Sequence, residues 1–117
     1  CYDLRFPVFA RNDVDYDVLL FVANWPNTRI AAWDVLLKAR AIENQAYVIG
    51  LNRVGTDGFN ADYPGHSQVL DPEGDCISMA PEYEVGLVEV TLSRNNLMAC
   101  RKRHPFLSDR DAFTITD

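Results

Sequence analysis

Tyr16-Asp17-Val18-Leu19-Leu20-Phe21-Val22-Ala23 is the stretch that decides the fold of this chain. Its apolar residues are almost uninterrupted and rich in β-branched and aromatic side chains, a pattern that predicts a strand buried on both faces. Asn24-Trp25-Pro26-Asn27 then ends the strand. Because strands buried on both faces lie between layers of other elements, this stretch indicates an α/β protein.

The segment after this strand predicts a long helix. Asn27 or Thr28 is a suitable N-cap, and the helix is expected to end near Gln45. Asp34 and Lys38 have the spacing of a helical ion pair. The helix is apolar over more than one stripe, so we expect one side to pack on a sheet and the other side on a further partner.

The remainder predicts strands, a hairpin and a last helix. Residues 46–54 form the next strand, and Asp71-Pro72-Glu73-Gly74 has the composition of the tight turn of a hairpin. Alternation over residues 85–92 predicts a further strand. Ser93 caps a helix over residues 94–103. Strands separated by helices and then a hairpin give an α/β layered fold.

Composition excludes several classes of function. The 117 residues suit one domain or half of a two-layer domain, and 48% hydrophobic residues suffice for a core. A net charge of −6 argues against nucleic-acid and anionic-membrane partners, which require a basic face. No apolar run approaches the roughly 20 residues that span a bilayer. Three cysteines without metal-ligand spacing argue against a disulfide scaffold or zinc site and predict a cytoplasmic protein.

Cys1 is the candidate nucleophile. It opens the run Cys1-Tyr2-Asp3-Leu4-Arg5-Phe6-Pro7, and a helical turn or two is predicted over residues 5–11. A helix N-terminus favours the thiolate by lowering a pKa that is otherwise about 8.5, and its N–H groups bind an oxyanion when the thiolate adds to a carbonyl or nitrile carbon. A lone cysteine is more often structural than catalytic, so the neighbouring motifs must decide.

Those motifs resemble the carbon–nitrogen hydrolase (nitrilase) superfamily along the whole chain. The resemblance rests on the Cys1 run and on Asn24-Trp25-Pro26, Ala39-Arg40-Ala41-Ile42-Glu43-Asn44-Gln45, Asn52-Arg53-Val54-Gly55, Gly65-His66-Ser67 and Asp71-Pro72-Glu73-Gly74, in that order. Residues 40–48 and 52–58 look most like the omega-amidase branch. Members of that branch hydrolyse dicarboxylic acid mono-amides such as 2-oxoglutaramate and 2-oxosuccinamate.

The resemblance implies a fold and a mechanism. The fold would be half of a four-layer α-β-β-α sandwich, and the catalytic set would be Glu, Lys and Cys, with a thioester intermediate on Cys1 and no cofactor or metal. The family's Glu and Lys lie upstream of its cysteine. Residues 1–117 are therefore expected to be the C-terminal part of the domain. They are expected to be inactive alone, because neither the glutamates of this chain nor Lys38 correspond to the family's catalytic Glu and Lys.

Other residues are candidates for substrate binding and for a subunit interface. Tyr2, Asn24 and Trp25 follow the C-terminal ends of strands, where α/β sites gather ligands, so they either line the amide pocket or shape loops and pack. The helix over residues 28–45 corresponds to a region through which the family forms homodimers. We therefore expect a homo-oligomer that takes a small amide substrate and uses this helix as part of its interface.

Four side chains receive structural interpretations. Asp3 and Arg5 are expected to form an ion pair beneath the Cys1 turn. His66, between Gly65 and Ser67 at the start of a strand, is expected to be hydrogen-bonded and structural rather than the base of a Cys-His dyad. Cys76 and Cys100 are expected to be small buried hydrophobes.

Two alternatives to an amidase remain open at this point. The α-amine of Cys1 would act as the base in an N-terminal-nucleophile hydrolase, which needs no upstream Glu. A processed free α-amine beside the thiol would support this reading, and a preceding peptide bond would exclude it. A non-catalytic fragment or oligomerisation half would instead show an open sheet face, low solubility and ordinary thiol reactivity.

Overall fold

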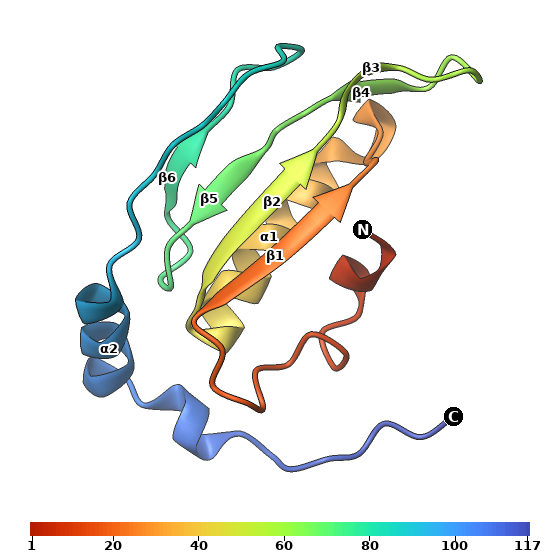
Figure 1. Cartoon of the computed structure of the whole chain (residues 1–117). Helices are drawn as coiled ribbons and strands as arrows, with labels where there is room; N and C mark the ends of the chain where they lie inside the picture. The colour runs from red at the N-terminus through yellow and green to blue at the C-terminus, as the bar shows by residue number, and fades with distance from the viewer.

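A mixed sheet with one long helix on one face forms the fold, as the computed structural model of residues 1–117 shows (Figure 1). The four-stranded sheet has the order β1-β2-β5-β6, and β3 and β4 form a separate two-stranded sheet. The strands are β1 (Val18–Ala23), β2 (Tyr47–Asn52), β3 (Val54–Thr56), β4 (Asp62–Pro64), β5 (Gln68–Leu70) and β6 (Cys76–Met79). β1 and β2 are parallel, and the other pairs are antiparallel.

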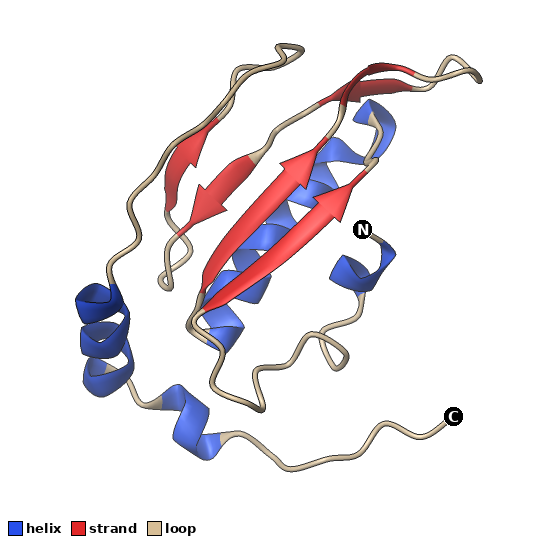
Figure 2. Cartoon of the chain, in the orientation of Figure 1, coloured by secondary structure: helices blue, strands red, loops and turns tan.

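Helices occupy both ends of the chain and the crossover between the parallel strands. They are the 3-10 helices η1 (Tyr2–Arg5), η2 (Asn27–Arg29) and η3 (Phe106–Asp109), and the α-helices α1 (Ile30–Asn44) and α2 (Arg94–Arg103). α1 joins β1 to β2 and lies along one face of the sheet (Figure 2). Neither α-helix has the length and apolar character that crossing a bilayer requires. The α/β prediction is confirmed.

The core lies between α1 and the sheet. Trp33, Leu37 and Ala41 of α1 are 0% exposed and belong to the same apolar cluster as Phe21 of β1 and Val48 of β2. Gly50 of β2 lets the helix approach closely, since a Cβ atom there would lie 2.5 Å from Cδ1 of Leu37. The packing of α1 on the sheet is therefore direct and leaves no room for a larger residue.

The opposite face of the sheet is open, so the prediction that the strand over residues 16–23 is buried on both faces is wrong. Along β1, burial alternates: Phe21 and Ala23 are buried, whereas Leu20 and Val22 are 59% and 62% exposed. Leu51 of β2, on the Leu20 and Val22 face, is 53% exposed. Within these residues only α1 supplies a covering layer. The smallest extent of the chain is 18 Å, which suits one sheet and one helix.

The helical part of the segment after Cys1 is shorter than predicted. The helical turn or two expected over residues 5–11 forms only in part: η1 ends at Arg5, and residues 7–10 make a single turn, in which the Ala10 N–H donates to the Phe6 carbonyl at 3.3 Å, without becoming a helix. Phe6 adopts an extended conformation with φ −115° and ψ 90°. Because Pro7 follows, its ring disfavours the helical conformation at Phe6 and ends the helix there.

The strand predicted over residues 85–92 is absent from the structure. This segment pairs with no other strand, and Val85 and Leu87 are 92% and 85% exposed. An alternating pattern fits a strand only where a neighbouring strand supplies hydrogen-bond partners. Here residues 84–88 line one cavity together with Val22 and Leu51 of the open face, but they pair with no strand.

The predicted cap of α2 and the predicted hairpin turn are confirmed, whereas the predicted cap of α1 is wrong. Ser93 caps α2 as predicted, because its side chain accepts a hydrogen bond from the Asn96 N–H. The turn at residues 71–74 joins β5 to β6, which confirms the hairpin. The capping role expected for Asn27 or Thr28 is wrong, since α1 begins after η2 and neither side chain makes a cap bond.

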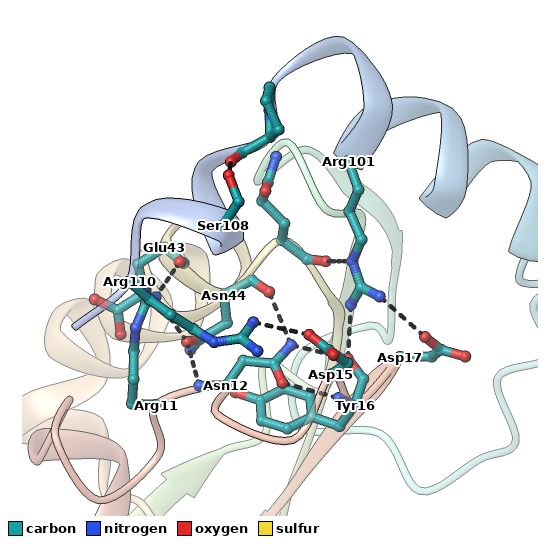
Figure 3. A network of polar contacts seen from close by, with 12 residues as sticks. Arg11, Asn12, Asp15, Tyr16, Asp17, Glu43, Asn44, Arg101, Ser108 and Arg110 are labelled. Carbon is teal, nitrogen blue, oxygen red and sulfur yellow. Dashed lines mark hydrogen bonds and ion pairs between the residues drawn. The ribbon is translucent and has the colours of Figure 1, made fainter. Parts of the chain in front are cut away.

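A polar network joins the loop after η1 to α1 and α2 (Figure 3). The side chain of Asn12 bonds to the backbone of Tyr16 and of Asn44, while the Asn12 N–H donates to the Asn44 side chain at 2.9 Å. Arg101 of α2 donates to the carbonyl groups of Gln45 and Tyr16 at 2.9 and 2.7 Å. These bonds tie the loop after η1 and the C-terminal end of α1 to α2.

Candidate active site

Cys1 lies at the start of η1 and is exposed. Its carbonyl oxygen accepts a hydrogen bond from the Leu4 N–H at 3.2 Å, which closes the single turn of η1. Cys1 lines a cavity of about 350 Å³ together with Asp3, Arg11, Tyr16 and the β1 residues 19–22. This volume is within the range of small-molecule sites, about 300–1,000 Å³, so a small ligand fits beside the thiol.

The polar residues around this cavity do not supply an obvious base. Burial and the nearby Glu43 carboxylate raise the pKa of Tyr16 to about 12. The phenol is therefore protonated at neutral pH, and it donates to the carbonyl oxygen of Ala10 at 2.6 Å. Arg11 is held by the Glu43 carbonyl and the Asn44 side chain.

A buried cation lies beneath η1. Arg40 of α1 is 3% exposed, and its Nη2 donates to the Leu4 carbonyl at 2.6 Å. Its Nη1 donates to the Glu43 carboxylate at 3.1 Å. Arg40 belongs to one of the motifs that carry the family resemblance, but no role was predicted for it. The available signal was a charged residue on the buried face of a helix, where an apolar residue is the rule.

Tyr2 and Trp25 occupy different environments from Cys1. Tyr2 is 71% exposed and contacts Phe6 edge to face with ring centroids 5.0 Å apart. Trp25 is 3% exposed, and the ring of Trp33 lies 5.6 Å from its own. The predicted ion pair of Asp3 with Arg5 does not form; the Arg5 guanidinium lies over Trp25 at 4.7 Å, because a cation stacks readily on an indole ring.

Asn24 lines a second cavity of about 490 Å³ on the open face of the sheet. Val22 lines both this cavity and the one beside Cys1, so the two adjoin at β1. Tyr2 and Trp25 line neither cavity. The structure thus brings Cys1 and Asn24 to neighbouring spaces and places Trp25 in the core, and substrate contact by Tyr2, Asn24 and Trp25 stays a prediction.

Asn52, at the end of β2, fixes the loop that carries Asn24 and Trp25. Its Oδ1 accepts from the Trp25 N–H at 2.7 Å, and its Nδ2 donates to the Trp25 carbonyl at 2.9 Å. Nδ2 also donates to the Gly65 carbonyl at 2.8 Å. The amide thereby ties the ends of three segments together. This role was not predicted from the sequence. The available signal was a polar residue at the end of a buried strand.

His66 is hydrogen-bonded, as predicted, and lines neither cavity, but its partner Asp34 was predicted to pair elsewhere. Its Nδ1 lies 2.9 Å from the nearer Asp34 oxygen, and its Nε2 lies 2.5 Å from Glu82. Burial lowers the pKa of His66, but hydrogen bonds to the two carboxylates outweigh it and raise the pKa above its usual value. The ion pair predicted between Asp34 and Lys38 is absent, because Asp34 bonds to His66 and Gln68 instead.

The other two cysteines differ from each other. Cys100 is 5% exposed, and burial raises the pKa of its thiol. Cys76 is exposed on β6, so its predicted burial is wrong. β6 is the last strand of the sheet, and no element covers it. No group of three or more His, Cys, Asp or Glu side chains is placed to bind a metal ion.

The chain is similar in sequence to known amidases. Residues 1–102 match the carbon–nitrogen hydrolase family. The chain is 49% identical over 115 residues to an omega-amidase of Escherichia coli K12, covering 98% of this chain and 45% of the relative. It is 41% identical over 114 residues to a 2-oxoglutaramate amidase of Paenarthrobacter nicotinovorans, covering 96% of this chain and 38% of the relative.

A solved structure supports the same relationship. The crystal structure of a CN-hydrolase superfamily protein from Xanthomonas campestris superposes with a TM-score of 0.95 at 45% identity. The match covers 99% of this chain and 46% of that protein, whose active site carries an arsenic adduct. The predicted nitrilase-type α/β fold is confirmed. The chain spans less than half the length of the relatives it matches.

Proposed function

The chain belongs to the carbon–nitrogen hydrolase family, and from this premise we propose that it supplies the nucleophile of an amidase. The observation that carries the proposal is the position of Cys1, exposed at the start of η1 and on the wall of a 350 Å³ cavity. The substrate class is a dicarboxylic acid mono-amide. The names of two relatives, an omega-amidase and a 2-oxoglutaramate amidase, support this choice.

The proposed reaction proceeds through a thioester. The thiolate of Cys1 attacks the amide carbon, a C–S bond forms, and the C–N bond breaks as the nitrogen takes a proton and leaves as ammonia. Water then attacks the thioester carbon, the C–S bond breaks, and the carboxylic acid is released with the thiol restored. The reaction consumes one water per amide and needs no redox partner.

We propose that the base and the lysine of this reaction lie outside these 117 residues. The chain has two lysines, Lys38 on α1 and Lys102 on α2; both are exposed, and neither lines the Cys1 cavity. The Cys1 cavity has Asp3 and Asp13 but no glutamate on its wall. Residues 1–117 would then be the C-terminal part of a catalytic domain and would show no turnover alone. The longer protein that contains them is called the complete protein below.

We further propose that the complete protein is a cytoplasmic homodimer. Val35 and Ile42 of α1 are 65% and 49% exposed, although the same helix buries Trp33 and Leu37 against the sheet. A second copy would cover these apolar side chains. All three cysteines are free, which suits a reducing compartment. Light scattering of Val35→Glu should then report monomers where the unsubstituted protein gives dimers.

The test of the reaction compares two exposed cysteines in the complete protein. Ammonia release from 2-oxoglutaramate should disappear in Cys1→Ala and should be unchanged in Cys76→Ala, because Cys76 lines neither cavity. Turnover that survives in Cys1→Ala would exclude Cys1 as the nucleophile. A mature protein that begins at Cys1, and that loses activity when its free α-amine is blocked with the thiol intact, would favour an N-terminal-nucleophile hydrolase instead.

A further inference from the structure

The buried guanidinium of Arg40 has one feature that its packing does not explain. Its side chain is 4% exposed, and Nε has no hydrogen-bond partner, although Nη2 and Nη1 contact Leu4 and Glu43. Burying a cation is costly, and an apolar residue of similar size in such a place is often as stable or more so. The guanidinium is therefore better explained by what it holds than by the stability it adds.

What it holds is the turn that carries Cys1. Nη2 of Arg40 donates to the Leu4 carbonyl at 2.6 Å, and the Leu4 N–H donates to the Cys1 carbonyl at 3.2 Å. Two contacts thus connect α1 with the backbone of the candidate nucleophile. No other side chain forms a hydrogen bond with the backbone of residues 1–5. The Leu4 side chain, 0% exposed, anchors the same turn in the core.

We propose that Arg40 is a positioning residue for Cys1, and this inference rests on the function proposed above. The planar guanidinium binds the Leu4 carbonyl and the Glu43 carboxylate at the same time, so its own orientation is fixed. It thereby fixes the direction in which η1 starts and the side on which the Cys1 thiol meets the cavity. A lysine has one nitrogen and lacks this fork, so it cannot reproduce both contacts in the same geometry.

The proposal predicts an effect on the chemical step rather than on binding. A misplacement of about 1 Å at the reacting group can cost about 100-fold in rate. We expect Arg40→Lys to lower kcat of the complete protein by about 10- to 100-fold with KM within about twofold. Iodoacetamide should also modify Cys1 more slowly, measured by mass spectrometry of the Cys1 peptide over a range of pH.

Arg101→Lys is the matched control. Arg101 also donates to two backbone carbonyls and to a carboxylate, at 2.9, 2.7 and 3.2 Å, but its partners are Gln45, Tyr16 and Asp17. It forms no hydrogen bond with η1. Its substitution should leave kcat and the rate of Cys1 modification unchanged, even where Tm falls as far as in Arg40→Lys.

A second variant covers the case in which Arg40→Lys does not fold. Glu43→Gln keeps the Arg40 contact with Leu4 but weakens the contact that orients the guanidinium, so kcat should fall in the same direction by a smaller factor. Unchanged kcat and unchanged Cys1 modification in both Arg40→Lys and Glu43→Gln would overturn the proposal. Equal losses in Arg101→Lys would also overturn it. If the unsubstituted protein releases no ammonia, the proposed function fails, while the modification rates still decide the role of Arg40.

Discussion

Replacing Gly50 by Ala tests the direct contact between α1 and β2. A Cβ atom at this position would lie 2.5 Å from Cδ1 of Leu37 and 2.8 Å from Cζ2 of Trp33. Ordinary carbon–carbon contacts are about 3.5–4.0 Å, so the helix must move by about 1 Å or the two side chains must leave their rotamers. Overpacking of this kind costs about 1–3 kcal/mol.

One favourable effect opposes this cost. Alanine reduces the conformational entropy of the unfolded chain and gains about 0.4–1 kcal/mol where the backbone permits it. We therefore expect Gly50→Ala to lower the free energy of unfolding by about 1–2 kcal/mol, measured by urea unfolding with tryptophan fluorescence. Gly86→Ala is the matched control, because nothing lies within 4 Å of its Cβ position and its free energy should stay within about 0.5 kcal/mol.

A double substitution identifies the contact itself. Leu37→Ala removes two of the three atoms nearest the new Cβ and leaves Cζ2 of Trp33, so Gly50→Ala should cost about 1 kcal/mol less on that background than alone. The reasoning is refuted if Gly50→Ala is as stable as the unsubstituted chain. It is also refuted if the two substitutions are additive, since the clash would then not involve Leu37.

Three further predictions concern residues that hold loops and helices. Asn52→Ala leaves the backbone groups of Trp25 unpaired, so urea unfolding should show a loss of about 2 kcal/mol. The pKa of His66 is raised in the folded state, so its contribution to stability is present below about pH 6.5 and is lost as pH rises through the folded-state pKa. In His66→Gln, Tm should therefore change less between about pH 5 and pH 9. Ser93→Ala removes the cap of α2 and should cost about 1 kcal/mol, whereas Ser93→Asp should retain it.

Each of these predictions has a contrary result. An Asn52→Ala chain that loses less than about 0.5 kcal/mol would show that water replaces its bonds. Parallel Tm curves for His66→Gln and the unsubstituted chain would show that the two carboxylates do not stabilise the charged ring. Equal losses in Ser93→Ala and Ser93→Asp would show that the hydroxyl contributes something other than capping.

Most strands and helices followed from local patterns, although the β3–β4 pair was not predicted, and the exposure of each element depended on what surrounds it. The turn at residues 71–74 and the cap at Ser93 are short-range features, and both were predicted. The strand over residues 16–23 carries a pattern for burial on both faces, yet only one face is covered here. The alternation over residues 85–92 likewise indicates a strand whose partner these residues do not provide. Both errors concern the open side of the sheet.

The site was predictable to a lesser extent. Cys1 was singled out by its motif, and its place on a cavity wall agrees with the predicted role without testing it. The sequence did not reveal that Arg40 contacts the Leu4 carbonyl or that Asn52 binds Trp25, because both contacts join residues more than 25 positions apart. Asp34 shows the same limit, since its partner His66 lies 32 positions away and its neighbour Lys38 was the wrong choice.

The central claim is that Cys1 carries the acyl group during amide hydrolysis. The most direct measurement is mass spectrometry of the complete protein, acid-quenched during turnover of 2-oxoglutaramate and digested to isolate the Cys1 peptide. The account predicts an acyl group on Cys1 that disappears once the substrate is consumed. Steady ammonia release with Cys1 unmodified throughout, or with the acyl group on another residue, would contradict it.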